Sequence, residues 1–201
     1  MEAQLTESPG KNNKLAGEYY LQDVIETASG FKLNPDSAFE FFFIYGALDQ
    51  SGSGTRTVQH NNILLNSKPR PGKDFALVRS KKTNDDSLVI KIVEANTFFL
   101  SHVYCLLSSG DKNPEQLSNK QGLINFPKQA ANTIMLPFEF CPERTSLFQA
   151  SDPTDNYFEF RFEPWILEVF FADFKLEINK DELKGPHPLL TGPSYRFVKN
   201  K

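Results

Sequence analysis

The chain has 201 residues, 39% hydrophobic and 23% charged, which is typical of a globular protein and excludes a wholly disordered one. At roughly 100–200 residues per domain, this length allows one large or two small domains. The net charge of −3 gives no overall attraction to nucleic acid, and no segment approaches the roughly 20 consecutive apolar residues that span a membrane as a helix.

Phenylalanine is the unusual feature of the composition, with 19 residues. A flat ring packs well on a pleated, half-buried surface, so a high phenylalanine content favours β structure. Residues 1–14 are polar and aperiodic and are predicted to form a disordered tail. They contain no apolar stretch, so they are not a signal peptide, and we expect the protein in the cytoplasm.

The first structured segments predict antiparallel strands at 17–22, 29–33 and 38–45. Residues 34–37 contain Asn, Pro, Asp and Ser, and they form a turn between the second and third strands. The third strand alternates, so four aromatic side chains share one face: Phe39, Phe41, Phe43 and Tyr45.

The next part of the chain mixes short strands with polar connections. Residues 46–54 are predicted to be a glycine-rich connection, and residues 80–87 a linker. Residues 68–73 contain two prolines, which remove ladder donors, so they are expected to form a stiff exposed loop. Strands are predicted at 55–59, 63–66 and 75–79.

The second half is also rich in strand patterns, and no window shows a sustained helical stripe. Phe158, Phe160 and Phe162 alternate with charged residues, as in a half-buried antiparallel sheet. Many short strands separated by turn residues indicate a sandwich or a barrel. Strands are predicted at 88–94, 97–107, 123–126, 133–140, 157–162, 166–171, 174–178 and 194–199.

Motifs for catalysis or metal binding are missing from the sequence. The three histidines form no metal-ligand spacing, and we expect His60 and His187 at the surface and His102 in the core. Cys105 and Cys141 form no Cys-x-x-Cys pair and are expected to be free, semi-buried thiols. A thiol–imidazole pair with His102 would rest on residue type alone. We therefore predict no catalytic residue, no metal and no cofactor.

Both ends of the chain carry motifs that resemble the lipocalin-like (calycin) barrels, including bacterial members without an assigned function. Gly17-Glu18-Tyr19 is similar to their first-strand Gly-x-Trp motif, and Tyr195-Arg196-Phe197 to their last strand. The resemblance implies that Gly17, Tyr19 and Arg196 close one end of an antiparallel barrel, complete or partial, with Arg196 stacked on Tyr19.

The resemblance also implies the domain organisation. Residues 15–82 and 165–199 are expected to form the lipocalin-like barrel. Residues 88–163 are similar to a small immunoglobulin-like or transthyretin-like β-sandwich, inserted into a loop of that barrel. Such an insertion costs little when its two ends lie close together.

Three functions follow as alternatives. The first is a non-enzymatic module that binds a small apolar molecule inside the barrel. The second is a protein-interaction module that uses the sandwich or free strand edges, with a homodimer or another protein as its partner. The third is an enzyme of unknown class. Whether the aromatic rings surround a cavity or fill the barrel is open. The predicted ligand-lining residues are Phe39, Phe41, Phe43, Tyr45, Phe171, Phe174 and Leu176.

Overall fold

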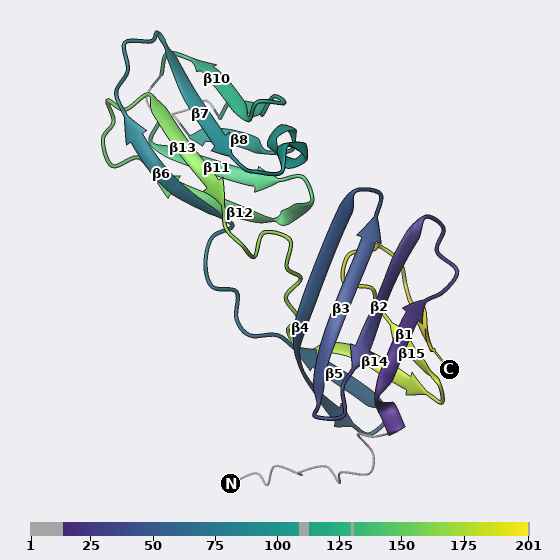
Figure 1. The fold of residues 1–201 in the computed structure, drawn as a ribbon. Helices are drawn as coiled ribbons and strands as arrows, with labels where there is room; N and C mark the ends of the chain where they lie inside the picture. Colours follow the sequence, from purple (N-terminus) through teal and green to yellow (C-terminus); the bar gives the residue numbers. More distant parts are fainter. Residues whose placement is uncertain (1–13, 109–112, 130, 201) are drawn as a thin grey trace, which may run out of the picture. The chain divides into compact units, whose positions relative to one another are not determined.

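The computed structural model describes residues 14–108, 113–129 and 131–200, and within them the chain is all-β, as predicted. Residues 1–13 of the expected tail lie outside the described part. The chain forms two compact units (Figure 1), made of Met1–Arg70 with Glu168–Lys201 and of Pro71–Leu167. Among the described residues, no helix has the length and apolar character needed to cross a membrane.

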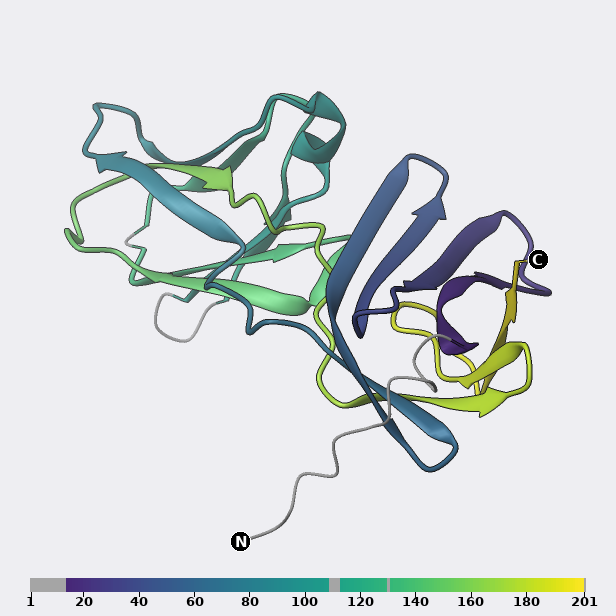
Figure 2. The same ribbon diagram turned by 60° about the horizontal axis from the view of Figure 1, so that its bottom comes forward.

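The first unit is a closed antiparallel barrel of eight strands, in the order β1-β16-β15-β14-β5-β4-β3-β2. In Figure 2 its early strands (purple and blue) and late strands (yellow-green) enclose a common interior. Closure pairs every strand on both sides, so this sheet has no free edge. The strands are β1 Gly17–Leu21, β2 Thr27–Leu33, β3 Ala38–Tyr45, β4 Leu48–Gln59, β5 Asn62–Asn66, β14 Phe174–Asn179, β15 Glu182–Gly185 and β16 Tyr195–Lys199.

Strand β4 corrects the prediction of a glycine-rich connection over residues 46–54. It begins at Leu48 and continues through the Ser-Gly-Ser-Gly run. A Cβ added at Gly52 would lie 2.7 Å from Cε2 of Phe171, and one at Gly54 would lie 2.9 Å from Cε1 of Phe39. The glycines therefore make room for aromatic rings inside the barrel rather than breaking the strand.

The contact that joins the first and last strands differs from the one implied by the lipocalin motif. Tyr19 is buried, and its hydroxyl donates to the carbonyl of Leu15 at 2.9 Å. The cation beside its ring is Lys199, with Nζ 5.8 Å from the ring centre, and the Lys199 stem lies where a side chain at Gly17 would go. Arg196 points outward because alternate residues of β16 face opposite sides, and it pairs with Glu182 at 3.0 Å.

The second unit consists of two four-stranded sheets around a single apolar core, and we call it the sandwich. One sheet has the order β10-β7-β13-β6, with β13 parallel to β7, and the other has the order β12-β11-β8-β9. The strands are β6 Phe75–Lys81, β7 Ser87–Val93, β8 Tyr104–Ser108, β9 Glu115–Leu117, β10 Leu123–Pro127, β11 Thr133–Phe138, β12 Cys141–Gln149 and β13 Tyr157–Phe162.

Several boundaries differ from those expected. Strand β6 pairs with β13, so residues 71–82 belong to the sandwich instead of the barrel. The predicted central strand over 97–107 begins as a 3-10 helix, η1 (Thr97–Ser101), whose first turn is capped by Asn96. The predicted strand over 166–171 is irregular, with only a single bridge from Glu168 to Ser51.

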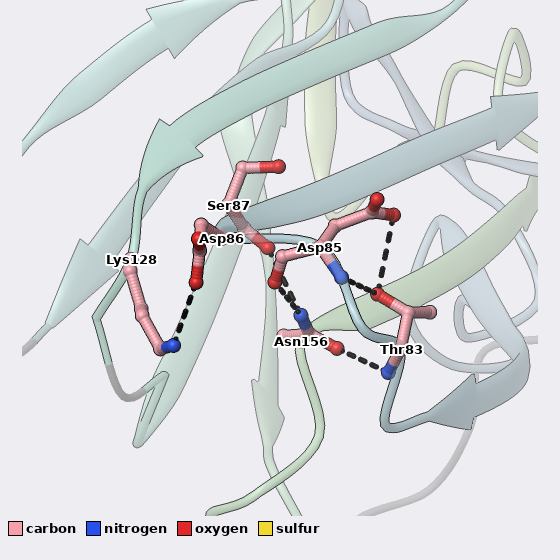
Figure 3. Close-up of polar contacts among 6 residues, drawn as sticks. All are labelled: Thr83, Asp85, Asp86, Ser87, Lys128 and Asn156. Atoms are coloured by element: carbon pink, nitrogen blue, oxygen red, sulfur yellow. Dashed lines mark hydrogen bonds and ion pairs between the residues drawn. The ribbon is translucent and has the colours of Figure 1, made fainter.

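The polar segment predicted as a linker over 80–87 is an ordered turn between β6 and β7 (Figure 3). Asn156 holds it: its Oδ1 accepts from the backbone N–H of Thr83 at 2.6 Å, and its Nδ2 donates to the carbonyls of Asp85 and Ser87 at 2.9 and 3.1 Å. Beside it, Lys128 pairs with Asp86 at 2.8 Å. One side chain at the start of β13 thus satisfies three backbone groups of the turn.

Candidate functional site on the outer face of the barrel

Most of the predicted ligand-lining residues do face the barrel interior. Five of them are buried: Phe39, Phe41, Phe43, Phe171 and Leu176. Phe174 is partly buried against the same core. Tyr45, by contrast, is 54% exposed, because it ends β3 at the hairpin turn to β4 and lies beyond the packed rings.

The aromatic rings inside the barrel contact one another. Phe31 lies 5.0 Å from Phe41 and 4.9 Å from Phe197, measured between ring centres. Phe171 lies 5.1 Å from Phe39 and 5.4 Å from Phe41. These distances are typical of packed edge-to-face pairs. Binding of an apolar molecule among these rings stays a prediction, and it would require side chains to move aside.

His187 is the buried polar centre of the barrel, although the sequence suggested a surface position. Its Nδ1 accepts from the backbone N–H groups of Leu189 and Leu190 at 3.0 and 3.1 Å, so the ring proton is on Nε2. That nitrogen lies 3.0 Å from Oγ of Ser29, which donates onward to the carbonyl of Phe42. Burial lowers the pKa of His187 to about 4, so the ring is neutral at pH 7 and both nitrogens are occupied.

The other residues considered for catalysis, Cys105, Cys141 and His102, also occupy structural positions. Burial raises the pKa of Cys105 to about 12 and that of Cys141 to about 11, which disfavours the reactive thiolate. His102 pairs through Nδ1 with Glu139 at 2.7 Å and lies against the rings of Phe98 and Phe140. Within the described residues, no group of three His, Cys, Asp or Glu side chains is arranged to hold a metal ion.

A groove of about 540 Å³ lies on the outer face of the barrel, across strands β1 to β4. The register of these strands places its outward residues in two parallel rows. The aromatic row is Tyr20, Gly30, Phe42 and Ser51. The charged row is Glu18, Lys32, Glu40 and Ser53.

Beside the groove, Gly30 lies between Tyr20 and Phe42 in the aromatic row and is buried beneath the ring of Phe42. A Cβ added at Gly30 would lie 2.3 Å from the carbonyl oxygen of Tyr19 and 2.9 Å from Cε1 of Phe42, so glycine is required there. The rings of Tyr20 and Phe42 approach edge to face above it, with centres 5.9 Å apart. Tyr20 is 39% exposed and therefore available to a ligand. On β4 the groove is lined by Ser51 and Ser53, whose side chains are small.

Three carboxylates and one ammonium group make the groove acidic. Lys32 pairs with Glu40 at 3.2 Å, and the amide of Asn34 donates to the same carboxylate. These two hydrogen bonds, that from Asn34 first, lower the pKa of Glu40. At the other end of the charged row, Glu18 accepts from the Tyr20 hydroxyl at 2.8 Å and raises the pKa of that phenol. The third carboxylate, Glu168, lines the groove beside Ser51.

A second hollow of about 450 Å³ continues the groove towards β5. Both hollows are lined by Glu40 and Ser53, and the second extends to Asn66, Ser67 and Lys68. The continuous surface therefore crosses five adjacent strands of the barrel. It is concave, partly aromatic and polar along one side, which are the features of a surface that binds an elongated molecule.

The sequence prediction named none of the outward residues of this groove. Each row joins residues from four different strands, so it becomes visible only once the register is known. The sequence did contain one indication of the groove, Ser51 and Ser53, because small side chains on the outward face of β4 leave space there.

The chain matches no protein-family model, no curated protein and no solved structure. The geometry of the groove is therefore the basis for a functional proposal.

Proposed function

We propose that this protein is a non-enzymatic binding module that holds an extended segment of a partner protein in the outer groove of its barrel. The observation that carries the proposal is the pair of parallel rows, one aromatic and one charged, beside a groove of about 540 Å³. A protein partner is the second of the functions expected from the sequence. The contact surface differs from the one expected there, because it is the barrel wall instead of the sandwich or a strand edge.

The dimensions of the groove suit an extended chain. Neighbouring strands lie about 4.8 Å apart, so the rows from β1 to β4 span roughly 14 Å. An extended polypeptide covers this length in about four residues. The rings of Tyr20 and Phe42 would contact an apolar side chain of that segment, while Glu18, Lys32 and Glu40 fix its orientation through polar contacts.

Kinship with the lipocalin-like barrels stays a prediction from the terminal motifs. The closed barrel supports that prediction, whereas the cation beside Tyr19 comes from Lys199 and not from Arg196. An outer groove does not depend on this kinship, because it requires only the register of β1 to β4.

The test is to block the groove without altering the core. A library of random octapeptides would be screened against the whole protein, and the affinities of selected peptides measured by fluorescence anisotropy. Ser53→Trp places a large side chain at the junction of the two hollows and should weaken binding at least tenfold. Thr57→Trp, also exposed on β4 but outside the groove, should leave the affinity unchanged.

Thermal unfolding of both variants would verify that each still folds. Equal affinity of the selected peptides for the wild-type protein and for Ser53→Trp would contradict the proposal, as would the absence of any selected peptide.

A further inference from the structure

We propose that residues 186–194, which connect β15 to β16, form a latch that closes one end of the barrel at neutral pH and is released in acid. His187 holds this latch closed, and its release exposes the apolar interior of the barrel to solvent. The latch is separate from the outer groove, which is lined by residues of β1 to β4 and by Glu168.

The latch depends on side chains to hold it in place. It is longer than the roughly two to five residues that usually connect the strands of a hairpin. Pro186, Pro188 and Pro193 have no backbone N–H and cannot donate to a strand. Among the described residues, no backbone–backbone hydrogen bond joins residues 186–194 to another element.

His187 connects the latch to strands on two sides of the barrel end. The hydrogen bond from its Nε2 reaches Ser29 of β2, which is separated from β16 by β1 in the sheet order. Its ring stacks on Phe197 of β16, with centres 5.9 Å apart, and lies 5.5 Å from the ring of Phe43 on β3. Since Phe43 is the cross-strand partner of Ser29, these contacts lie at one end of the barrel.

The other contacts of the latch are local or apolar. The Tyr195 hydroxyl donates to the carbonyl of Thr191 at 2.9 Å and ties the last part of the latch to the start of β16. Leu189 and Leu190 are partly buried against the barrel core. His187 is therefore the residue whose polar contacts join the latch to the opposite side of the opening.

Protonation removes these polar contacts because Nδ1 of His187 is an acceptor. It accepts from the backbone N–H groups of Leu189 and Leu190. A protonated imidazole carries hydrogen on both nitrogens, so Nδ1 would face two donors and lose both bonds. The buried charge would also lie among aromatic rings. Acid thus favours a state in which the latch has left the barrel and His187 is in water.

Neighbouring charges do not offset this cost. His187 is the only titratable side chain of the latch. The charged side chains on the adjacent strands alternate with inward residues and so face outward: Glu18, Lys32, Glu40, Asp49, Glu182, Lys184 and Arg196. Asp23 and Glu26, in the turn between β1 and β2, are exposed. Two cations lie towards the other end, Arg56 beside the Asn34 carbonyl and Lys199 beside Tyr19.

Hydrogen exchange of the whole protein, followed by NMR, tests the latch through the amides of Leu189 and Leu190. Their protection factors, which correct for the intrinsic pH dependence of exchange, should fall about 50-fold between pH 7 and pH 4.5. This factor follows from a pKa of about 4 for His187 in the closed state and 6.5 in the open state.

Low concentrations of urea distinguish release of the latch from unfolding of the barrel. A local opening exposes little surface, so about 1 M urea should leave the protection of Leu189 and Leu190 unchanged. Amides in the middle of β2 and β3 should be more protected than these two, and their protection should decrease with urea, because they exchange when the whole barrel opens.

Three variants assign the acid response. His187→Gln should reduce the change between pH 7 and pH 4.5 to less than about twofold, since glutamine does not titrate. The matched control, His60→Asn, replaces an exposed histidine of the turn between β4 and β5 and should keep the 50-fold response. Tyr195→Phe loses the hydrogen bond to Thr191 and should lower protection about fivefold at both pH values, with the acid response intact.

Two results would overturn the inference. If the amides of Leu189 and Leu190 matched those of β2 and β3 in protection and in urea dependence at every pH, the latch would open only when the barrel unfolds. If His187→Gln kept the acid response, a group other than His187 would control the latch. Neither result bears on peptide binding in the outer groove, which Ser53→Trp tests.

Discussion

The barrel and the sandwich solve the problem of sheet edges in different ways. The barrel pairs every strand with two neighbours, so only its faces and its ends can contact a partner. The sandwich has edge strands, and its edge strand β6 shows two protective features: a register shift in its pairing with β13, and basic residues Arg79 and Lys81. Strand addition is therefore unavailable to the barrel, whose partners must contact its wall or its ends, and it is disfavoured at the β6 edge of the sandwich.

The two units bury different polar side chains. The sandwich has an apolar core between its two sheets, and it also buries Ser118, Ser146 and Asp74, which pairs with Arg144 at 3.1 Å. The barrel interior combines packed phenylalanines with buried polar residues, including Ser29, Gln50, Arg56 and His187. The stability of the barrel should therefore respond to pH through a buried group.

The largest effect should come from removing one core ring from each unit. Phe31→Ala removes a ring that contacts four others in the barrel, and Phe138→Ala removes a fully buried ring of the sandwich. Each should cost about 3–5 kcal/mol in the free energy of unfolding of its own unit. Calorimetry would measure both unfolding transitions. The fluorescence of the single tryptophan, Trp165, would identify the transition of the sandwich. Equal shifts of both transitions in either variant would show that the units unfold together.

Acid should destabilise the barrel through His187. The pKa of this ring is about 4 in the folded barrel and 6.5 ordinarily, so between these pH values the unfolded chain takes up a proton that the folded barrel does not. Unfolding free energy should fall by about 3 kcal/mol as pH decreases from 6.5 to 4, and level off below that.

Urea unfolding at several pH values would measure this effect. His187→Gln keeps an uncharged polar side chain, so its unfolding free energy should lack this component of the pH dependence. If the unfolding free energies of the variant and the wild-type protein changed with pH in the same way, the acid effect could not be assigned to His187.

A smaller effect should distinguish the two basic residues of the last strand. Lys199→Ala removes the cation beside Tyr19 and the hydrogen bond from Nζ to the carbonyl of Lys14, and should cost about 1 kcal/mol. Arg196→Ala removes only half-exposed ion pairs and should cost less than about 0.5 kcal/mol. Chemical denaturation would rank the unfolding free energies of the two variants. A larger loss for Arg196→Ala would favour Arg196, as the lipocalin motif implies, as the cation that stabilises Tyr19.

Strands with a clean alternation could be predicted from the sequence, and others could not. Strand β3 alternates buried phenylalanines with outward residues, and its hairpin with β2 was predicted correctly. Strand β12 was missed because it begins with a polar Cys-Pro-Glu-Arg segment, and much of it is exposed at the edge of its sheet. The 3-10 helix η1 was taken for a strand because its two phenylalanines and leucine resemble an apolar strand pattern.

The candidate site was less predictable than the fold. The alternating hydrophobic pattern of the sequence predicts the inward-facing aromatic rings, which stabilise the barrel. The groove instead depends on outward residues from four strands, and on Glu168, which is distant in the sequence. The groove forms only when strands β1 to β4 pair in the observed register, and the sequence of a single strand does not determine that register.

The insertion point has a consequence for how the chain is made. Strands β5 and β14 pair directly in the barrel, yet the whole sandwich lies between them in the sequence. During synthesis the ribosome therefore delivers five barrel strands, then the complete sandwich, and only then the three strands that close the barrel. Since domains fold as units while they emerge, the sandwich should be native first, and the barrel strands made earliest must wait longest for their partners. Once folded, the sandwich shortens the loop that separates β5 from β14, and so reduces the entropy cost of closing the barrel.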